Sequence, residues 1–175
     1  MINAIRYIGF FFLLGSITSP LNAQFINLQL KVEPELSATV EQNLDFGTQV
    51  TNSGRTTVQL GDVNMGVFSI RAFHTQNLYI SLQYPDQLTN EDPGIENQIP
   101  LELDMAYNNQ DTNDATNANL LDANRGLVSI HERTQAEFDQ EIWKEMYIYV
   151  FGAIDVGNIP NGVYTADIIL TIDYD

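Results

Sequence analysis

The stretch that decides the fold is YTADIILTIDY, residues 164–174. Almost every second residue in it is apolar or aromatic, and the residues between them are mostly Thr or Asp. Side chains of a β-strand point alternately to its two faces, so this pattern predicts a strand with one buried and one solvated face. We therefore expect this segment to cover one side of a hydrophobic core.

Similar segments recur upstream, separated by Gly, Asn, Asp and Pro, which are typical of turns. They are residues 26–32, 36–40, 55–60, 67–73, 78–84 and 101–107. Residues 146–154 (MYIYVFGAI) are apolar at almost every position, which indicates a central strand covered on both faces. The whole set predicts an all-β fold, a two-layer immunoglobulin-like β-sandwich of about eight or nine mostly antiparallel strands.

The N-terminus has the features of an export signal. Residues 7–14 (YIGFFFLL) form an apolar run that follows Arg6, and the small residue Ala23 marks a suitable cleavage point. This predicts a signal peptide over residues 1–23 and a single domain over residues 24–175; the alternative is an uncleaved hydrophobic N-terminus. The run is far shorter than the roughly 20 apolar residues that cross a bilayer, so no spanning segment is expected. We expect an exported protein in the periplasm, on the outer surface or in the medium.

Composition excludes several kinds of chemistry. The chain has no cysteine, so disulfides, thiol catalysis and cysteine-bound zinc are excluded. Beyond residue 23, the sequence has 23 acidic and six basic side chains, a formal charge of −17. Such a surface repels nucleic acid and anionic lipid, and it suits divalent cations, basic partners or simply solvation in salt.

Catalytic patterns are weak. His74 and His131 are the only histidines, both are expected on the surface at strand ends, and no Gly-x-Ser-x-Gly motif occurs. Glu102 and Asp104 share a strand face, but adjacent carboxylates on a solvated face do not make the separated pair that a glycosidase needs. The sequence therefore predicts a protein that is not an enzyme.

Residues 108–124 are polar and predict a long exposed loop with a weak candidate calcium site. Its oxygen-bearing residues at positions one, three, seven, nine and twelve of an EF-hand-like spacing are Asp111, Asn113, Asn117, Asn119 and Asp122. However, Ala115 and Thr116 occupy positions five and six, where a ligand and a glycine belong, and position twelve is not glutamate. The alternative is a polar surface loop, and no other cofactor is expected.

Two aromatic groups are ambiguous. Tyr147, Tyr149 and Phe151 alternate along one strand, where they would either pack against the protein or form a platform that stacks on sugars or a partner. Residues 134–145 (TQAEFDQEIWKE) predict either a helical turn or a bulged edge strand. In both cases Phe138, Ile142 and Trp143 would cover one end of the core.

Several short segments resemble a bacterial family of exported domains, the domain of unknown function 4402. They are LDFG at 44–47, GVFSI at 66–70, NLYISLQYP at 77–85, VFGAIDVG at 150–157 and GVYTA at 162–166. The resemblance implies a pilin-like or spore-coat-like β-sandwich with a role in assembly or surface display, and it brings no catalytic residue. The chain departs from the family at Ala153, where relatives usually have a second glycine.

These observations favour a structural or adhesive surface protein, a fimbrial-like subunit that assembles by strand addition. The candidate strand consists of Ile26, Leu28, Leu30 and Val32 with the polar residues between them. It would pair either with its own sheet, as an ordinary first strand, which we favour, or with the edge of a neighbouring subunit. The alternative function is a monomeric secreted module that binds carbohydrate or calcium.

Overall fold

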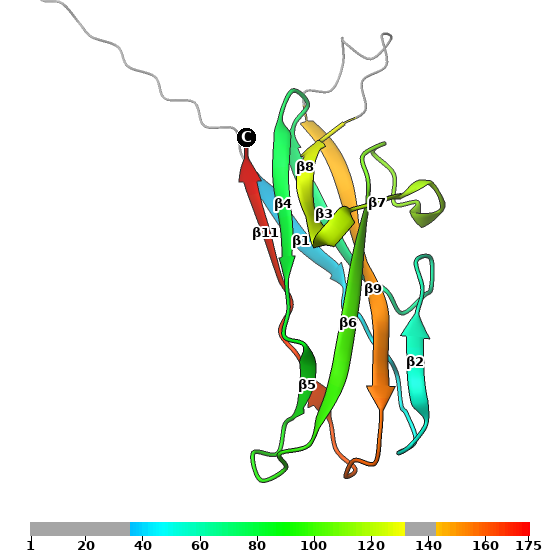
Figure 1. The fold of residues 1–175 in the computed structure, drawn as a ribbon. Helices are drawn as coiled ribbons and strands as arrows, with labels where there is room; N and C mark the ends of the chain where they lie inside the picture. The colour runs from blue at the N-terminus through cyan, green and yellow to red at the C-terminus, as the bar shows by residue number, and fades with distance from the viewer. Residues whose placement is uncertain (1–35, 132–142) are drawn as a thin grey trace, which may run out of the picture. The chain divides into compact units, whose positions relative to one another are not determined.

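The computed structural model describes residues 36–131 and 143–175, and most of these residues form strands (Figure 1). The expected signal peptide, the candidate strand at residues 26–32, and Phe138 and Ile142 lie outside the described residues. The strands are β1 (Ser37–Gln42), β2 (Gly54–Val58), β3 (Gly66–Phe73), β4 (Asn77–Gln83), β5 (Gln87–Asn90), β6 (Gln98–Asn108), β7 (Asn119–Leu120), β8 (Arg125–Ser129), β9 (Trp143–Val156), β10 (Tyr164–Thr165) and β11 (Ile169–Tyr174). Two short 3-10 helices, η1 (Ala115–Asn117) and η2 (Asp122–Asn124), interrupt the chain between β6 and β8.

Strand β9 organises the larger sheet. It pairs with β3 and then β2 along one edge and with β6 along the other, all antiparallel. The sheet runs in the order β1-β3-β9-β6-β5-β10, and β11-β4-β8 forms the second, smaller sheet. Tyr149 and Val150 are neighbours that point to opposite faces of β9, and both are fully buried. The predicted central strand covered on both faces is therefore confirmed.

The main core lies between the two sheets. Fully buried side chains from both layers meet in it, among them Ile70 of β3, Ile80 of β4 and Ile148 of β9. A smaller cluster, made of Val58, Met65, Val67, Ala106 and Tyr149, covers part of the outer face of the larger sheet. The predicted all-β sandwich is confirmed, and its larger sheet is apolar on both faces around β9.

The predicted single strand over residues 164–174 is wrong in one respect. β10 pairs with β5 in the larger sheet, whereas β11 pairs with β4 in the smaller one. Residues 166–168 therefore carry the chain from one sheet to the other. The alternating pattern continues through this crossing because Ala166 and Ile168 still pack against the core.

The predicted exposed loop is confirmed for residues 110–124, none of which is buried, but Asn108, the last residue of β6, and Asn109 are buried. Asn108 is 1% exposed, and its amide donates a hydrogen bond to the Asp114 carbonyl at 2.7 Å. Asn109 is also buried and donates to the Ser129 carbonyl at 3.0 Å. These two hydrogen bonds satisfy buried amides and connect the end of β6 with the loop that follows it and with β8.

In residues 36–131 and 143–175, no helix is long and apolar enough to cross a bilayer.

Trp143 lies at the end of β3. Its ring packs edge-on against Phe73, with the two ring centroids 6.1 Å apart. Trp143 is half-buried and is the first residue of β9. That it covers one end of the core stays a prediction.

Candidate functional site

β1 and β11 are each an end strand of their sheet, and the opposite end strands are β10 and β8. Among the described residues, β1 pairs only with β3, and β11 pairs only with β4. Figure 1 shows β11 at the margin of the domain, with β1 running behind it. We call the side that these two strands limit the open side of the sandwich.

The inner face of β1 is not covered. Ala38 lies opposite Ile70 and Val40 lies opposite Phe68 in the antiparallel ladder, and opposite residues point to the same face. Ile70 and Phe68 belong to the core, so Ala38 and Val40 also point inward. Val40 is nevertheless 55% exposed, and all six residues of β1 are exposed. Its inward side chains therefore lack a covering layer among the described residues.

The outer edge of β11 carries backbone groups that can pair. The Asp175 amide donates to the Asn77 carbonyl at 3.1 Å, so Asp175 and Asn77 are a hydrogen-bonded pair of the antiparallel ladder between β11 and β4. By alternation, the backbone groups of Thr171 and Asp173 bond to β4, and those of Leu170 and Ile172 point away from it. The Leu170 and Ile172 side chains pack against the core but stay partly exposed. The edge thus combines outward hydrogen-bonding groups with an incompletely covered apolar strip.

Such an edge can template another strand. Proteins commonly protect edge strands with Lys, Pro or bulges, because unpaired backbone groups recruit further strands. β11 has the sequence ILTIDY, with a single charged residue, Asp173, and neither Lys nor Pro. Its chemistry therefore suits β-strand addition, in which backbone bonds give affinity and alternate side chains fill the apolar strip.

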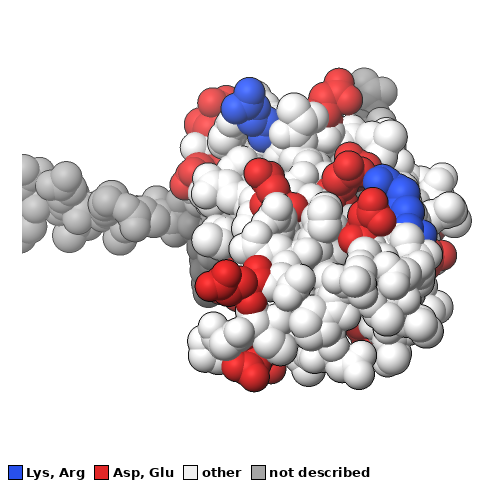
Figure 2. Space-filling view, turned by 60° about the horizontal axis from the view of Figure 1, so that its bottom comes forward, with Lys and Arg blue, Asp and Glu red and all other residues white. Residues whose placement is uncertain are grey.

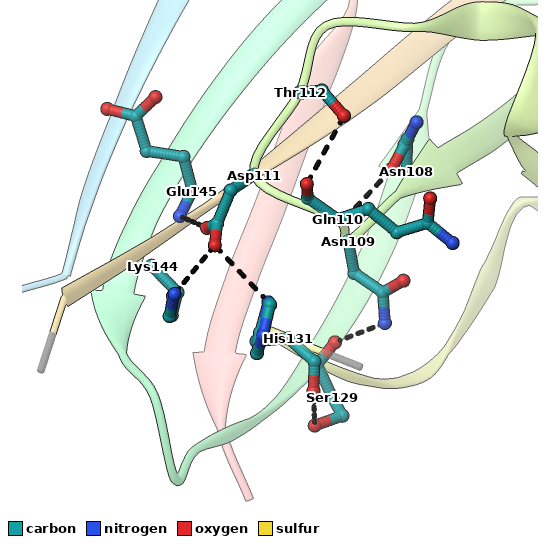
Figure 3. Close-up of polar contacts among 9 residues, drawn as sticks. All are labelled: Asn108, Asn109, Gln110, Asp111, Thr112, Ser129, His131, Lys144 and Glu145. Atoms are coloured by element: carbon teal, nitrogen blue, oxygen red, sulfur yellow. Dashed lines mark hydrogen bonds and ion pairs between the residues drawn. The ribbon is translucent and has the colours of Figure 1, made fainter. Parts of the chain in front are cut away.

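A second site surrounds Asp111 (Figure 3). Its Oδ2 accepts a hydrogen bond from Lys144 Nζ at 2.8 Å and lies 3.4 Å from His131 Nδ1. Its Oδ1 accepts the backbone N–H of Glu145 at 2.8 Å. Lys144 and His131 are 9% and 7% exposed, so the carboxylate stabilises a buried cation and fastens the β6–β8 loop to β9. The predicted surface position of His131 is wrong, because the ring is buried beside this carboxylate.

The residues of the predicted calcium site have other contacts. Asp111 binds Lys144, Asn113 accepts the Tyr149 hydroxyl at 3.1 Å, and Asn117 donates to Asp114 at 2.7 Å. Asn119 lies in β7, and Asp122 begins η2. In the described part of the chain, no three acidic or histidine side chains gather to hold a metal ion. Calcium binding at this loop stays a prediction.

Asp114, which the calcium spacing leaves out, organises the turn. Its carboxylate accepts hydrogen bonds from the Thr116 hydroxyl, the Thr116 amide and the Asn117 amide. These bonds, led by the one from the Thr116 side chain, lower the pKa of Asp114 below its usual value. The sequence signal that could have identified Asp114 is the D-A-T-N run. In such a run the Asp side chain caps the helical turn that follows by accepting the backbone N–H two residues later.

Of the three alternating aromatic residues of β9, only Tyr149 is clearly packed against the protein. Tyr149 is fully buried in the outer cluster, so it packs against the protein and is not part of an open platform. Burial raises the pKa of its hydroxyl to about 12. Tyr147 and Phe151 on the same face stay partly exposed.

A shallow hollow lies beside Phe151 on the outer face of the larger sheet. Its volume is about 180 Å³, and Arg55, Glu102 and Asp104 line it together with Gly152. Arg55 and Glu102 form an exposed ion pair at 2.6 Å. Figure 2 shows a face of the domain on which acidic side chains outnumber basic ones.

No protein-family model matches this chain, and no curated protein matches it. The resemblance to the domain of unknown function 4402 therefore stays a prediction from short segments.

Proposed function

We propose that this protein is an exported, non-enzymatic structural or adhesive surface protein, a fimbrial-like subunit that assembles by strand addition. The observation that carries the proposal is Val40, an inward-pointing side chain that is 55% exposed at the open side of the sandwich. An uncovered core face beside an unprotected strand edge is the surface that a strand from a partner completes.

A matched pair of substitutions tests this proposal. Val40→Lys places a charge on the uncovered inner face, whereas Val63→Lys makes the same charge change at a loop residue that is 87% exposed. We expect the purified exported chain to self-associate in sedimentation velocity, and Val40→Lys to weaken association at least about tenfold, or 1.4 kcal/mol. Val63→Lys should associate like the unmodified chain.

Because both sites are exposed, each variant should keep its free energy of unfolding within about 0.5 kcal/mol. A chain that stays monomeric up to high micromolar concentration would contradict assembly. Equal weakening by both substitutions would show that association depends on net charge and not on the open side.

A second candidate, a monomeric secreted module that binds carbohydrate, is favoured by the hollow beside Phe151. A partly exposed ring next to carboxylate and guanidinium groups offers both stacking and hydrogen bonds to a sugar. A glycan array together with calcium calorimetry tests it. Binding that Phe151→Ala abolishes would support this candidate, and no binding in either experiment would exclude it.

A further inference from the structure

We propose that the outer edge of β11 accepts residues 26–32 of a second copy, as an antiparallel strand that extends the smaller sheet. This inference rests on the proposed function and names its donor, its acceptor and their direction. The acceptor is the strip formed by Leu170 and Ile172, whose outward backbone groups and partly exposed side chains are described above.

The donor sequence fits this strip in length and pattern. Residues 26–32 (INLQLKV) have four apolar residues at alternate positions, and β11 has six residues. With Leu28 opposite Ile172, the register also places Leu30 opposite Leu170. Every apolar donor side chain then points inward, toward the uncovered side chains of β1, and the polar donor residues point to solvent.

The topology restricts how a chain could use its own segment. Ser37 pairs with Arg71 near the end of β3, and Leu78, at the start of β4, pairs with Tyr174. A turn bond from the Gln76 amide to the Phe73 carbonyl joins β3 to β4. The beginning of β1 and the end of β11 therefore lie at the same end of the domain.

In the stated register, the chain's own segment is too short to reach an antiparallel position. Val32 is four residues before Leu36, a reach of at most about 14 Å. The six residues of β11 span about 17 Å, so Val32 cannot reach the Ile169 end of the strand. In the stated register, the chain's own segment could therefore pair with β11 only as a parallel strand.

The parallel arrangement is less favourable than the antiparallel one. It would require Glu33, Pro34 and Glu35 to cross between the sheets, about 10 Å apart, beside the carboxylates of Asp173 and Asp175. Parallel pairing is also slightly less stable per residue. A second copy avoids both costs, and the antiparallel direction brings its Lys31 toward the end of β11 that follows Asp167.

Donor and acceptor are different parts of each chain, so the contact is head-to-tail. Each copy that receives a strand still offers its own donor segment to the next copy. A heterologous contact of this kind continues into an open polymer unless its rotation closes a ring.

Cysteine pairing tests the proposal, because the natural chain has no cysteine. In the stated register Gln29 lies opposite Thr171, and both side chains point outward. Gln29→Cys in one preparation and Thr171→Cys in another are mixed and oxidised mildly. We expect a disulfide-linked heterodimer on a non-reducing gel, at least about tenfold more abundant than for Gln29→Cys mixed with Val63→Cys.

The double variant, with both cysteines in one chain, separates the remaining outcomes. A ladder of linked copies supports exchange between copies, and a closed monomer of increased mobility overturns it in favour of the chain's own parallel strand. Heterodimer no more abundant than the Val63→Cys control also overturns the inference. The proposed function then still stands if Val40→Lys weakens association, and it fails as well if the chain never associates.

Discussion

A Cβ atom at Gly152 would lie 2.1 Å from the backbone oxygen of Glu102 and 2.9 Å from the Cα of Leu103. β9 and β6 thus approach at this point so closely that only glycine fits. Because Leu103 lies opposite Gly152 in the ladder and is buried, the contact sets the spacing at the centre of the larger sheet.

Gly152→Ala should lower the free energy of unfolding by on the order of 3 kcal/mol, because the backbone of β6 must move. Urea unfolding followed by circular dichroism measures the loss. Gly157→Ala is the control, since nothing lies within 4 Å of its Cβ position, and it should be neutral or slightly stabilising. Equal stability of the two variants would contradict the close approach.

Asp111→Asn should destabilise the domain by on the order of 2 kcal/mol, because the buried Lys144 ammonium loses its carboxylate. The asparagine keeps an oxygen for the Glu145 amide, so the loss reports mainly on the charge. The control Glu102→Gln removes the exposed pair with Arg55 and should cost less than about 1 kcal/mol. Thermal unfolding at neutral pH compares the stability of the two variants. A larger loss of stability for Glu102→Gln would show that the exposed pair matters more than the buried one.

Stability should fall above pH 10. The buried Tyr149 hydroxyl has its pKa raised to about 12, from an ordinary value near 10. Below pH 10 the hydroxyl is protonated in both the folded and the unfolded state, so it does not change the free energy of unfolding with pH. Between pH 10 and 12 the hydroxyl ionises in the unfolded chain but not in the folded one, which favours the unfolded state.

Tyr149→Phe should therefore reduce the fall in stability by on the order of 2 kcal/mol over this range, measured by urea midpoints at successive pH values. At neutral pH it should lose about 1 kcal/mol with the bond to Asn113. Tyr79→Phe, at a ring that is 42% exposed, is the control and should leave the profile unchanged. An identical alkaline slope in all three proteins would contradict the burial effect.

Self-association should strengthen with salt. The sequence beyond residue 23, which is the part expected to remain after cleavage, carries a formal charge of −17, so copies repel one another at low ionic strength. Raising sodium chloride from about 50 to 500 mM shortens the screening length from over 10 Å to about 4 Å and should favour larger species in sedimentation velocity. Weaker association in high salt would instead indicate contacts made by charge pairs.

The sequence predicts the sandwich well because the period of two survives wherever a strand faces the core. It does not predict the change of sheet at residues 166–168, since the pattern records which side is buried and not which strand is hydrogen-bonded. β8 was missed because its five residues, RGLVS, alternate too briefly to stand out. The buried His131 lies beside Asp111, twenty residues away in the sequence, and no local pattern predicts such a contact.

The crossing from β10 to β11 also has a mechanical meaning. If neighbouring copies join at β11, a force along the polymer reaches six cross-strand pairs with β4 at once, in shear, and does not peel them apart singly. Through three residues of backbone the same load passes directly into the larger sheet. A polymer joined in this way would resist stretching along its length.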